Sequence, residues 1–242
     1  MIDWDNIDTV LLDMDGTLVD VRFSYRRAIV QTARQLLTEH GADDATVQRV
    51  DADLVDTFKR RGGLNNDWDC TLAICRELGV KPGRDEVIST FQQRYRGTRY
   101  DGLIANERWL LSDAGAEALT RFAGLGVVTG RPKAEADWTL RRHAEDLAVE
   151  LVAMEDTVED KPHPEPLLRG LRQTGGESAA YIGDSVDDMA AARAAGMFAI
   201  GVLVPGQDWH SGWPERLHEA GADVVFEHVN AAIAWLSEAL AQ

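Results

Sequence analysis

The chain has 242 residues, a formal net charge of −16 and 45% hydrophobic residues. This length suits one large domain, or one domain with a smaller companion, and the composition is ordinary for a globular protein. The acidic charge argues against nucleic acid as a partner, because phosphate backbones require a basic surface. We find no apolar run long enough for a membrane span, no signal-peptide pattern at the N-terminus and too few cysteines for a disulfide framework, so we expect a cytoplasmic protein with no membrane partner.

Residues 9–18 (Thr-Val-Leu-Leu-Asp-Met-Asp-Gly-Thr-Leu) combine a short apolar run with two aspartates. The run at 9–12 predicts a buried strand, so Asp13 and Asp15 follow at its rigid end. Two carboxylates about 4 Å apart repel by about 4 kcal/mol at an effective dielectric constant of about 20. The pair therefore predicts a neutralising partner, either a divalent cation or a lysine. The alternative is that Asp15-Gly16 forms an ordinary turn after the strand.

Helical patterns alone fill the next part of the chain, residues 22–97. The predicted helices, which are separated by breaks containing glycine and proline, are 24–40, 44–60, 66–78 and 84–95. A block of helices inserted after the first strand predicts a small helical domain formed by residues 21–100.

From about residue 113 the pattern changes to alternating strands and helices. The predicted strands are 126–129, 150–153, 179–183, 198–202 and 223–226, and the predicted helices are 114–123, 133–145, 165–174, 187–195 and 229–240. This alternation predicts an α/β core of residues 1–20 and 101–242, with a doubly wound, mostly parallel sheet and helices on both faces. Residues 203–216 are predicted to be a loop rich in turn residues.

Polar residues follow several of these predicted strands, where doubly wound sheets bind their ligands. Thr129-Gly130 offers a hydroxyl and a free amide at a helix start, which suits a phosphate group. Lys161 lies in a proline-containing loop, and Asp184 and Asp188 follow the next strand. Each residue taken singly has a structural explanation, since Thr129 and Asp184 can cap helices and a lone lysine can be solvated.

The ordered set of Asp-x-Asp, Thr, Lys and Gly-Asp-x-x-x-Asp resembles the haloacid dehalogenase-like hydrolase superfamily. The resemblance covers the whole chain, because the helical block between the first two motifs is similar to that superfamily's C1 cap. The loop at 161–164 (Lys-Pro-His-Pro) and Gly183-Asp184-Ser185 look most like the phosphoglycolate-phosphatase branch. The resemblance implies a phosphoric monoester hydrolase that acts on a small phosphorylated metabolite.

The resemblance also implies catalytic and metal-binding roles. Asp13 would be the nucleophile that forms an aspartyl-phosphate, and Asp15 the general acid and base. The implied cofactor is Mg²⁺, held by Asp13, the backbone carbonyl of Asp15 and Asp184, with Asp188 as a further carboxylate. Because Asp187 stands beside Asp188, the sequence leaves open which of the two supports the metal.

The phosphoryl oxygens would be held by Thr129, the Gly130 amide and Lys161, and Thr17 is a further substrate-binding candidate. Many members of this branch carry Asn after the hydroxyl residue of the second motif, whereas this chain has Gly130-Arg131. Arg131 either contacts the substrate or forms a salt bridge within the fold, and we favour the second role.

Within the helical block, residues 60–68 are the least helix-like stretch. Arginine, amide and tryptophan side chains suit a loop that recognises substrate, which makes candidates of Arg61, Asn65, Asn66 and Trp68. The alternative is a plain connection between helices, in which Asn66 or Asp67 caps the next helix.

Two other functions compete with the phosphatase. A phosphomutase of the same family keeps the phosphoenzyme intact for a second transfer, and nothing in the sequence excludes it. A receiver-type signalling domain also combines an acceptor Asp, a Thr or Ser, a Lys and magnesium, but it needs neither Asp15 nor the helical block. A dehalogenase is disfavoured because that chemistry does not use the second aspartate.

Overall fold

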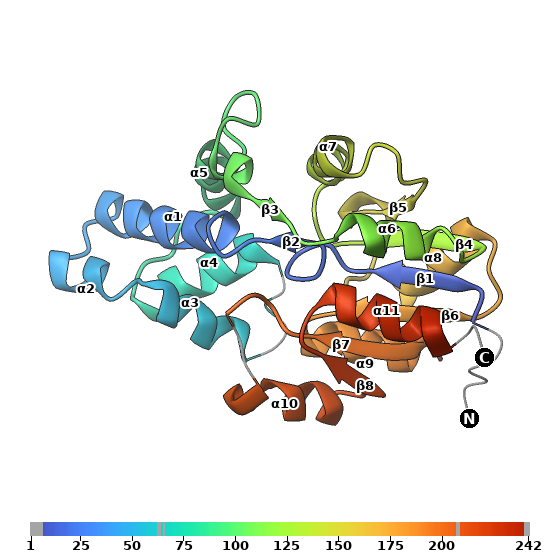
Figure 1. The fold of residues 1–242 in the computed structure, drawn as a ribbon. Helices are drawn as coiled ribbons and strands as arrows, with labels where there is room; N and C mark the ends of the chain where they lie inside the picture. The colour runs from blue at the N-terminus through green and yellow to red at the C-terminus, as the bar shows by residue number, and fades with distance from the viewer. Residues whose placement is uncertain (1–6, 62–63, 65, 207–208, 240–242) are drawn as a thin grey trace. The chain divides into compact units, whose positions relative to one another are not determined.

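The structure is a computed structural model that describes residues 7–61, 64, 66–206 and 209–239 (Figure 1). The chain divides into two compact units, one formed by Met1–Asp20 with Trp109–Gln242 and the other by Val21–Arg108. The second unit therefore extends eight residues past the predicted end of the helical domain at residue 100. No helix in the described part of the chain has the length and apolar character needed to cross a bilayer.

The first unit is built on a six-stranded sheet with the order β5-β4-β1-β6-β7-β8, in which every neighbouring pair is parallel. Its strands are β1 (Thr9–Leu12), β4 (Gly124–Val128), β5 (Glu150–Val152), β6 (Ala179–Gly183), β7 (Phe198–Val202) and β8 (Val224–Phe226). The central strands are buried along their whole length, as expected for a parallel sheet covered on both faces. The predicted α/β fold class is confirmed.

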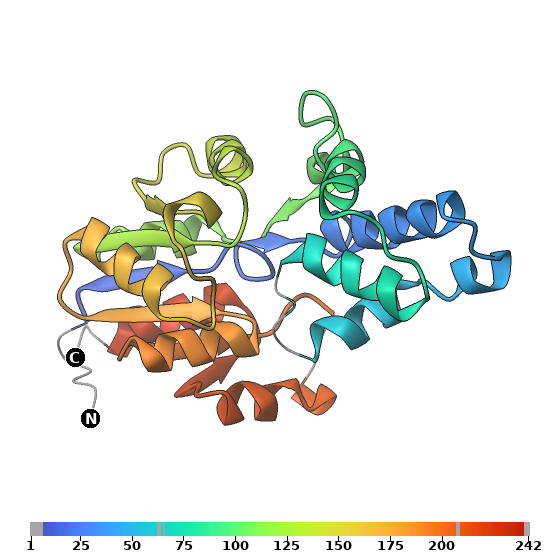
Figure 2. The same cartoon turned by 180° about the vertical axis from the view of Figure 1, so that it is seen from behind.

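Helices cover both faces of this sheet, as Figures 1 and 2 show from opposite sides. They are α6 (Asp113–Leu119), α7 (Lys133–His143), α8 (Glu165–Thr174), α9 (Val186–Ala194), α10 (Trp213–Glu219) and α11 (Val229–Ala239), with short 3-10 turns η3 (Met154–Asp156) and η4 (Trp209–Ser211). On one face Leu167, Met189 and Leu217, from α8, α9 and α10, share a buried cluster with Leu11 and Tyr181 of the strands. Helices α6 and α11 pack against each other, and α11 packs on β7 and β8.

The second unit is helical. It contains α1 (Tyr25–Glu39), α2 (Asp44–Gln48), α3 (Ala52–Lys59), α4 (Asp67–Glu77), α5 (Arg84–Tyr95) and η2 (Leu103–Asn106), and α1 packs against each of the other helices from α2 to α5. Cys70 and Cys75 are free and buried on α4, and burial raises the pKa of these thiols to about 11 and about 12. The two-residue strands β2 (Val19–Asp20) and β3 (Arg108–Trp109), which belong to the first unit except for Arg108, pair with each other.

The predicted single helix at 44–60 is wrong, because the structure has two helices there, α2 and α3. The Asp51 side chain accepts a hydrogen bond of 2.8 Å from the backbone N–H of Leu54 and so caps a new helix. Aspartate at this position satisfies an N–H group that has no partner within the helix. Asp51 is therefore a sequence signal for a second helix, although the helical pattern of residues 44–60 looks continuous.

The predicted loop at 203–216 is also partly wrong, since α10 begins at Trp213. Gly212 precedes the helix with a φ of +72°, and Pro214 lies in its first turn. Proline is favoured at the start of a helix because its missing N–H is not needed there. Proline and glycine thus marked a helix boundary rather than a continuous loop.

Candidate active site

The predicted polar residues gather at one edge of the sheet in the first unit. Strand β1 lies between β4 and β6 and is parallel to both. Asp13, Thr129 and Asp184 directly follow these three strands, so they emerge at the same carboxyl edge. The chain returns to the sheet at β4 after leaving β1, and at β7 after leaving β6, so the connections from these two neighbouring strands run in opposite directions along the sheet. Doubly wound folds bind ligands in the crevice at such a point.

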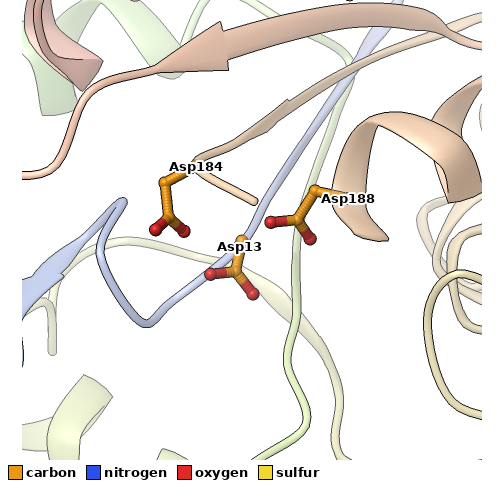
Figure 3. Close-up of side chains that lie close together, drawn as sticks. All are labelled: Asp13, Asp184 and Asp188. Carbon is orange, nitrogen blue, oxygen red and sulfur yellow. The ribbon is translucent and has the colours of Figure 1, made fainter. Parts of the chain in front are cut away.

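Three carboxylates converge at this edge (Figure 3). Asp13, Asp184 and Asp188 each offer one oxygen, and these oxygens lie within 4.8 Å of one another. Asp13 and Asp188 are buried, and Asp184 is half-buried. Among the described residues, Asp188 rather than Asp187 joins this carboxylate group. A set of carboxylate oxygens matches the ligand preference of a hard divalent cation such as Mg²⁺.

Lys161 is the cation of this cluster. Its Nζ lies 2.6 Å from an oxygen of Asp13 and 2.6 Å from an oxygen of Asp188. It also lies 2.9 Å from the Tyr181 hydroxyl and 3.3 Å from the carbonyl oxygen of Val128. The side chain is almost fully buried, so four oxygens share the three N–H donors of one ammonium group.

Two residues that fix Asp188 were missed as site residues. The Tyr181 hydroxyl donates to one oxygen of Asp188 at 2.9 Å, and the Ser185 hydroxyl and amide donate to the other at 2.6 and 3.0 Å. Ser185 also caps the helix that follows, because its hydroxyl accepts from the Asp188 amide at 3.1 Å. Tyr181 gave no signal, since an aromatic residue within a buried strand is typical of a core.

The charges in this cluster do not balance. Burial raises the pKa of Asp13 to about 7, against the opposing attraction of Lys161. Burial also acts to raise the pKa of Asp188, but the attraction of Lys161 lowers it overall. Burial opposes the charge on Lys161, yet Asp13 and Asp188 hold its pKa well above the ordinary value. One lysine cannot neutralise all the carboxylates, so the donor set fits an additional cation.

Close backbone approach accounts for two glycines at the site. Gly16 has a φ of +92°, and a Cβ atom there would lie 2.4 Å from Oδ2 of Asp184. A Cβ atom at Gly183 would lie 2.6 Å from Cγ of Asp188. The carbonyl oxygen of Asp184 also accepts a hydrogen bond of 3.0 Å from Nε1 of Trp213. The carboxylate group is therefore packed tightly by the turns that carry it.

Thr129 and Gly130, which are predicted to bind phosphate, directly follow β4. Thr129 is buried, and its hydroxyl accepts a hydrogen bond of 3.2 Å from the Arg131 amide. Gly130 is exposed, and no heavy atom lies within 4 Å of the point where a Cβ atom would stand. Thr17 follows β1 and is buried, and its hydroxyl has no hydrogen-bond partner in the structure as described.

Arg131 forms a salt bridge with Asp15. The Arg131 Nε donates to Oδ1 of Asp15 at 2.6 Å, and Nη2 contacts the same oxygen. Nη1 donates to the Thr139 hydroxyl at 3.1 Å. The arginine side chain is only 4% exposed, whereas that of Asp15 is 24% exposed. The intramolecular role that we favoured for Arg131 thus has a specific partner, the second aspartate of the first motif.

A protein-family comparison agrees with this arrangement of motifs. Residues 7–196 match the model of the haloacid dehalogenase-like hydrolase family. The chain belongs to this family. The predicted family and the predicted assignment to the hydrolase enzymes are confirmed, because the match covers most of the chain.

Individual relatives of this haloacid dehalogenase-like hydrolase include phosphatases. It is 27% identical over 237 residues to phosphoglycolate phosphatase from Salmonella typhimurium, covering 93% of this chain and 90% of that one. It is 35% identical over 209 residues to imidazoleglycerol-phosphate dehydratase from Phytophthora nicotianae, covering 82% of this chain but only 44% of that longer protein. A solved haloacid dehalogenase-like hydrolase from Bacteroides fragilis has the same fold, with a TM-score of 0.70, 23% identity and coverage of 94% of this chain and 100% of that one.

The remaining predicted substrate-binding residues of the hydrolase belong to its helical unit. Arg61 forms an ion pair of 2.7 Å with Glu77, and the Asn66 side chain caps α4 by accepting from the amides of residues 68 and 69. The Trp68 ring lies 5.9 Å from the Arg84 guanidinium. Asn65 lies outside the described residues. Each described candidate has a contact within the helical unit, and its part in substrate recognition stays a prediction.

Proposed function

We propose that this hydrolase is a Mg²⁺-dependent phosphatase that acts on a small phosphorylated metabolite through an aspartyl-phosphate on Asp13. The observation that carries the proposal is the position of Asp13 at the end of β1. Its carboxylate lies 2.6 Å from Lys161 and forms one cluster with Asp184 and Asp188. A nucleophilic carboxylate beside a cation and further metal-ligating carboxylates is suited to attack on a negatively charged phosphoryl group.

The proposed reaction has two steps. A carboxylate oxygen of Asp13 attacks phosphorus, the bond from phosphorus to the ester oxygen breaks, and Asp15 gives its proton to the departing alcohol. Asp15 then takes a proton from water as that water attacks phosphorus, and the bond from phosphorus to the Asp13 oxygen breaks to release inorganic phosphate. Thr129, the Gly130 amide and Lys161 hold the phosphoryl oxygens through both steps.

Asp13, Asp184 and Asp188, with the backbone carbonyl of Asp15, are the residues that would hold Mg²⁺. A bound Mg²⁺ supplies charge stabilisation to the phosphoryl oxygens. In its absence Asp13 carries a raised pKa because of burial, so the cluster itself favours the uptake of positive charge. Asp188 is held by Tyr181 and Ser185 as well as Lys161, which suits a carboxylate that fixes the geometry of the site.

The relatives suggest where to begin a substrate search. One is a phosphoglycolate phosphatase, and another is an imidazoleglycerol-phosphate dehydratase. We therefore place 2-phosphoglycolate and imidazoleglycerol phosphate first among the candidate phosphate monoesters. We assign recognition of the leaving group to the helical unit, as its cap, with Arg61, Asn65, Asn66 and Trp68 as the candidate residues.

The test is phosphate release from nitrophenyl phosphate and from the candidate metabolites, with and without MgCl₂. We expect release to require Mg²⁺ and to fall by at least about 10³-fold in Asp13→Asn, since the nucleophile is lost. Asp113→Asn is the matched control, because Asp113 is an exposed residue in the first turn of α6. Full activity of Asp13→Asn would overturn the proposal, and so would conversion of a sugar phosphate into its isomer without free phosphate.

A further inference from the structure

The salt bridge between Arg131 and Asp15 supports a further inference, which rests on the proposed function. We propose that Arg131 is a positioning residue that holds Asp15 for proton transfer to the leaving group. Its contribution is therefore largest for phosphate esters of alcohols that are poor leaving groups. This role differs from direct binding of substrate and from a salt bridge that only stabilises the fold.

The burial of Arg131 argues against direct contact with substrate. The side chain is 4% exposed and is held at both ends of its guanidinium group, by Asp15 and by Thr139. Thr139 on α7 is itself fully buried. An arginine fixed in this way presents a rigid, planar set of donors, which a lysine does not reproduce.

The two carboxylate oxygens of Asp15 have different surroundings, which suits a residue that is fixed in position and still transfers a proton. Nε and Nη2 of Arg131 both contact Oδ1, and across the described residues no hydrogen bond engages Oδ2. Asp15 remains 24% exposed, unlike the almost fully buried Asp13. One oxygen is therefore fixed by the arginine, and the other is available for a proton and for the leaving group. A proton donor must be held close to its working geometry to be effective.

The backbone links the Arg131–Asp15 salt bridge to the proposed phosphate-binding residues. Arg131 follows Thr129 and Gly130 directly, and its amide donates to the Thr129 hydroxyl at 3.2 Å. Its carbonyl oxygen accepts from the Met154 amide at 3.0 Å, which ties the same turn to η3. One short turn thus determines both where the phosphoryl group binds and where the proton donor stands.

The experiment measures kcat/KM for nitrophenyl phosphate and for glycerol phosphate, because kcat/KM reports the steps up to departure of the leaving group. Nitrophenolate leaves without a proton, whereas an alkoxide needs one. In Arg131→Met we expect kcat/KM to fall less than about tenfold for nitrophenyl phosphate and at least about 10²-fold for glycerol phosphate, in line with the usual contribution of general acid catalysis. Arg172→Met, at an exposed position of α8, should change neither value.

Three further variants separate positioning from a fold role. Thr139→Val should give the same leaving-group dependence with smaller losses, and it serves if Arg131→Met fails to fold. Arg131→Lys should recover only part of the loss. In an Asp15→Asn background, Arg131→Met should cause no additional loss with glycerol phosphate, because the two residues act through one interaction.

Equal losses for both esters in Arg131→Met and in Thr139→Val would overturn the positioning role, as would a full additional loss in the Asp15→Asn background. These results presuppose a wild-type enzyme whose phosphate release depends on Asp13. An inactive wild type, or an active Asp13→Asn, would instead overturn the proposed function, so the two failures are distinguishable.

Discussion

Two aspartates separated by one residue have very different surroundings in this protein. On the lysine side of the site, Asp13 is buried and shares Lys161 with Asp188 and Tyr181. On the arginine side, Asp15 is partly exposed and is held by Arg131, which Thr139 supports. The lysine is shared between two carboxylates, whereas the arginine holds Asp15 by one oxygen. These different surroundings match the separate roles that the proposed function gives the two residues, Asp13 as nucleophile and Asp15 as the group that transfers protons.

Of the changes on the lysine side, removal of Lys161 should cause the largest losses of stability and activity. Lys161→Met leaves Asp13 and Asp188 buried without their cation, and loss of one partner of a buried ion pair costs about 3–5 kcal/mol of unfolding free energy. We expect activity to fall by at least about 10³-fold as well, because the proposed function has Lys161 hold a phosphoryl oxygen. Denaturant unfolding and phosphate release measure the two effects.

Lys133→Met is the matched control for that change. Lys133 forms an exposed ion pair of 3.1 Å with Asp156, and such surface pairs contribute about 0–1 kcal/mol. If Lys161→Met were as stable as Lys133→Met, Lys161 would not be the buried counter-ion that the geometry indicates.

The raised pKa of Asp13 predicts that Mg²⁺ stabilises the protein more at pH 8 than at pH 6. In the metal-free folded protein, Asp13 takes up a proton as the pH falls through about 7, whereas its ordinary pKa is 3.8. Its contribution to stability is therefore present at low pH and lost as the pH rises from about 4 to about 7. The pKa of Asp188 is lowered, so its contribution changes only below the interval from pH 6 to 8.

Because Mg²⁺ and the proton compete for Asp13, the apparent Kd for Mg²⁺ should fall about tenfold from pH 6 to pH 8. At saturating metal this corresponds to about 1.4 kcal/mol of additional stabilisation. Thermal unfolding across a MgCl₂ titration at both pH values measures the change. Asp13→Asn should remove the pH dependence, and equal Kd values for the wild type at pH 6 and pH 8 would show that Asp13 does not compete for the metal.

The smallest effect on the lysine side should come from the tyrosine. Tyr181→Phe removes one hydroxyl that contacts both Lys161 and Asp188, at 2.9 Å in each case. We expect a loss of about 1 kcal/mol in unfolding free energy and less than a tenfold loss in kcat, because Ser185 still holds Asp188. A loss as large as that of Lys161→Met would mean that Tyr181 takes part directly in the chemistry.

The sequence predicted the fold and the site best where a functional residue directly follows an apolar strand. Buried apolar runs followed by polar residues predicted the parallel sheet and the gathering of Asp13, Thr129 and Asp184 at its edge. The helix starts after Asp51 and at Gly212-Trp213-Pro214 also have local sequence signals. The prediction missed them because each lies within a longer stretch that was assigned to one helix or one loop.

Side-chain partners were harder to predict than elements. Arg131 and Asp15 are 116 residues apart, and which way an arginine points from its turn depends on packing that a sequence pattern does not contain. Tyr181 lies in a buried strand and has the sequence appearance of a core residue, although its hydroxyl serves the ionic cluster. Contacts of this kind are set by the tertiary structure rather than by local propensity.

In the proposed function Asp13 accepts the phosphoryl group and Asp15 transfers protons. Asp15→Asn protein mixed with nitrophenyl phosphate and MgCl₂ tests it most directly, because the good leaving group allows the first step while the second step lacks its base. Mass spectrometry should then find one phosphoryl group on the peptide that contains Asp13. Attachment of that group to a different residue, or an unmodified peptide while phosphate is released at the wild-type rate, would contradict the account.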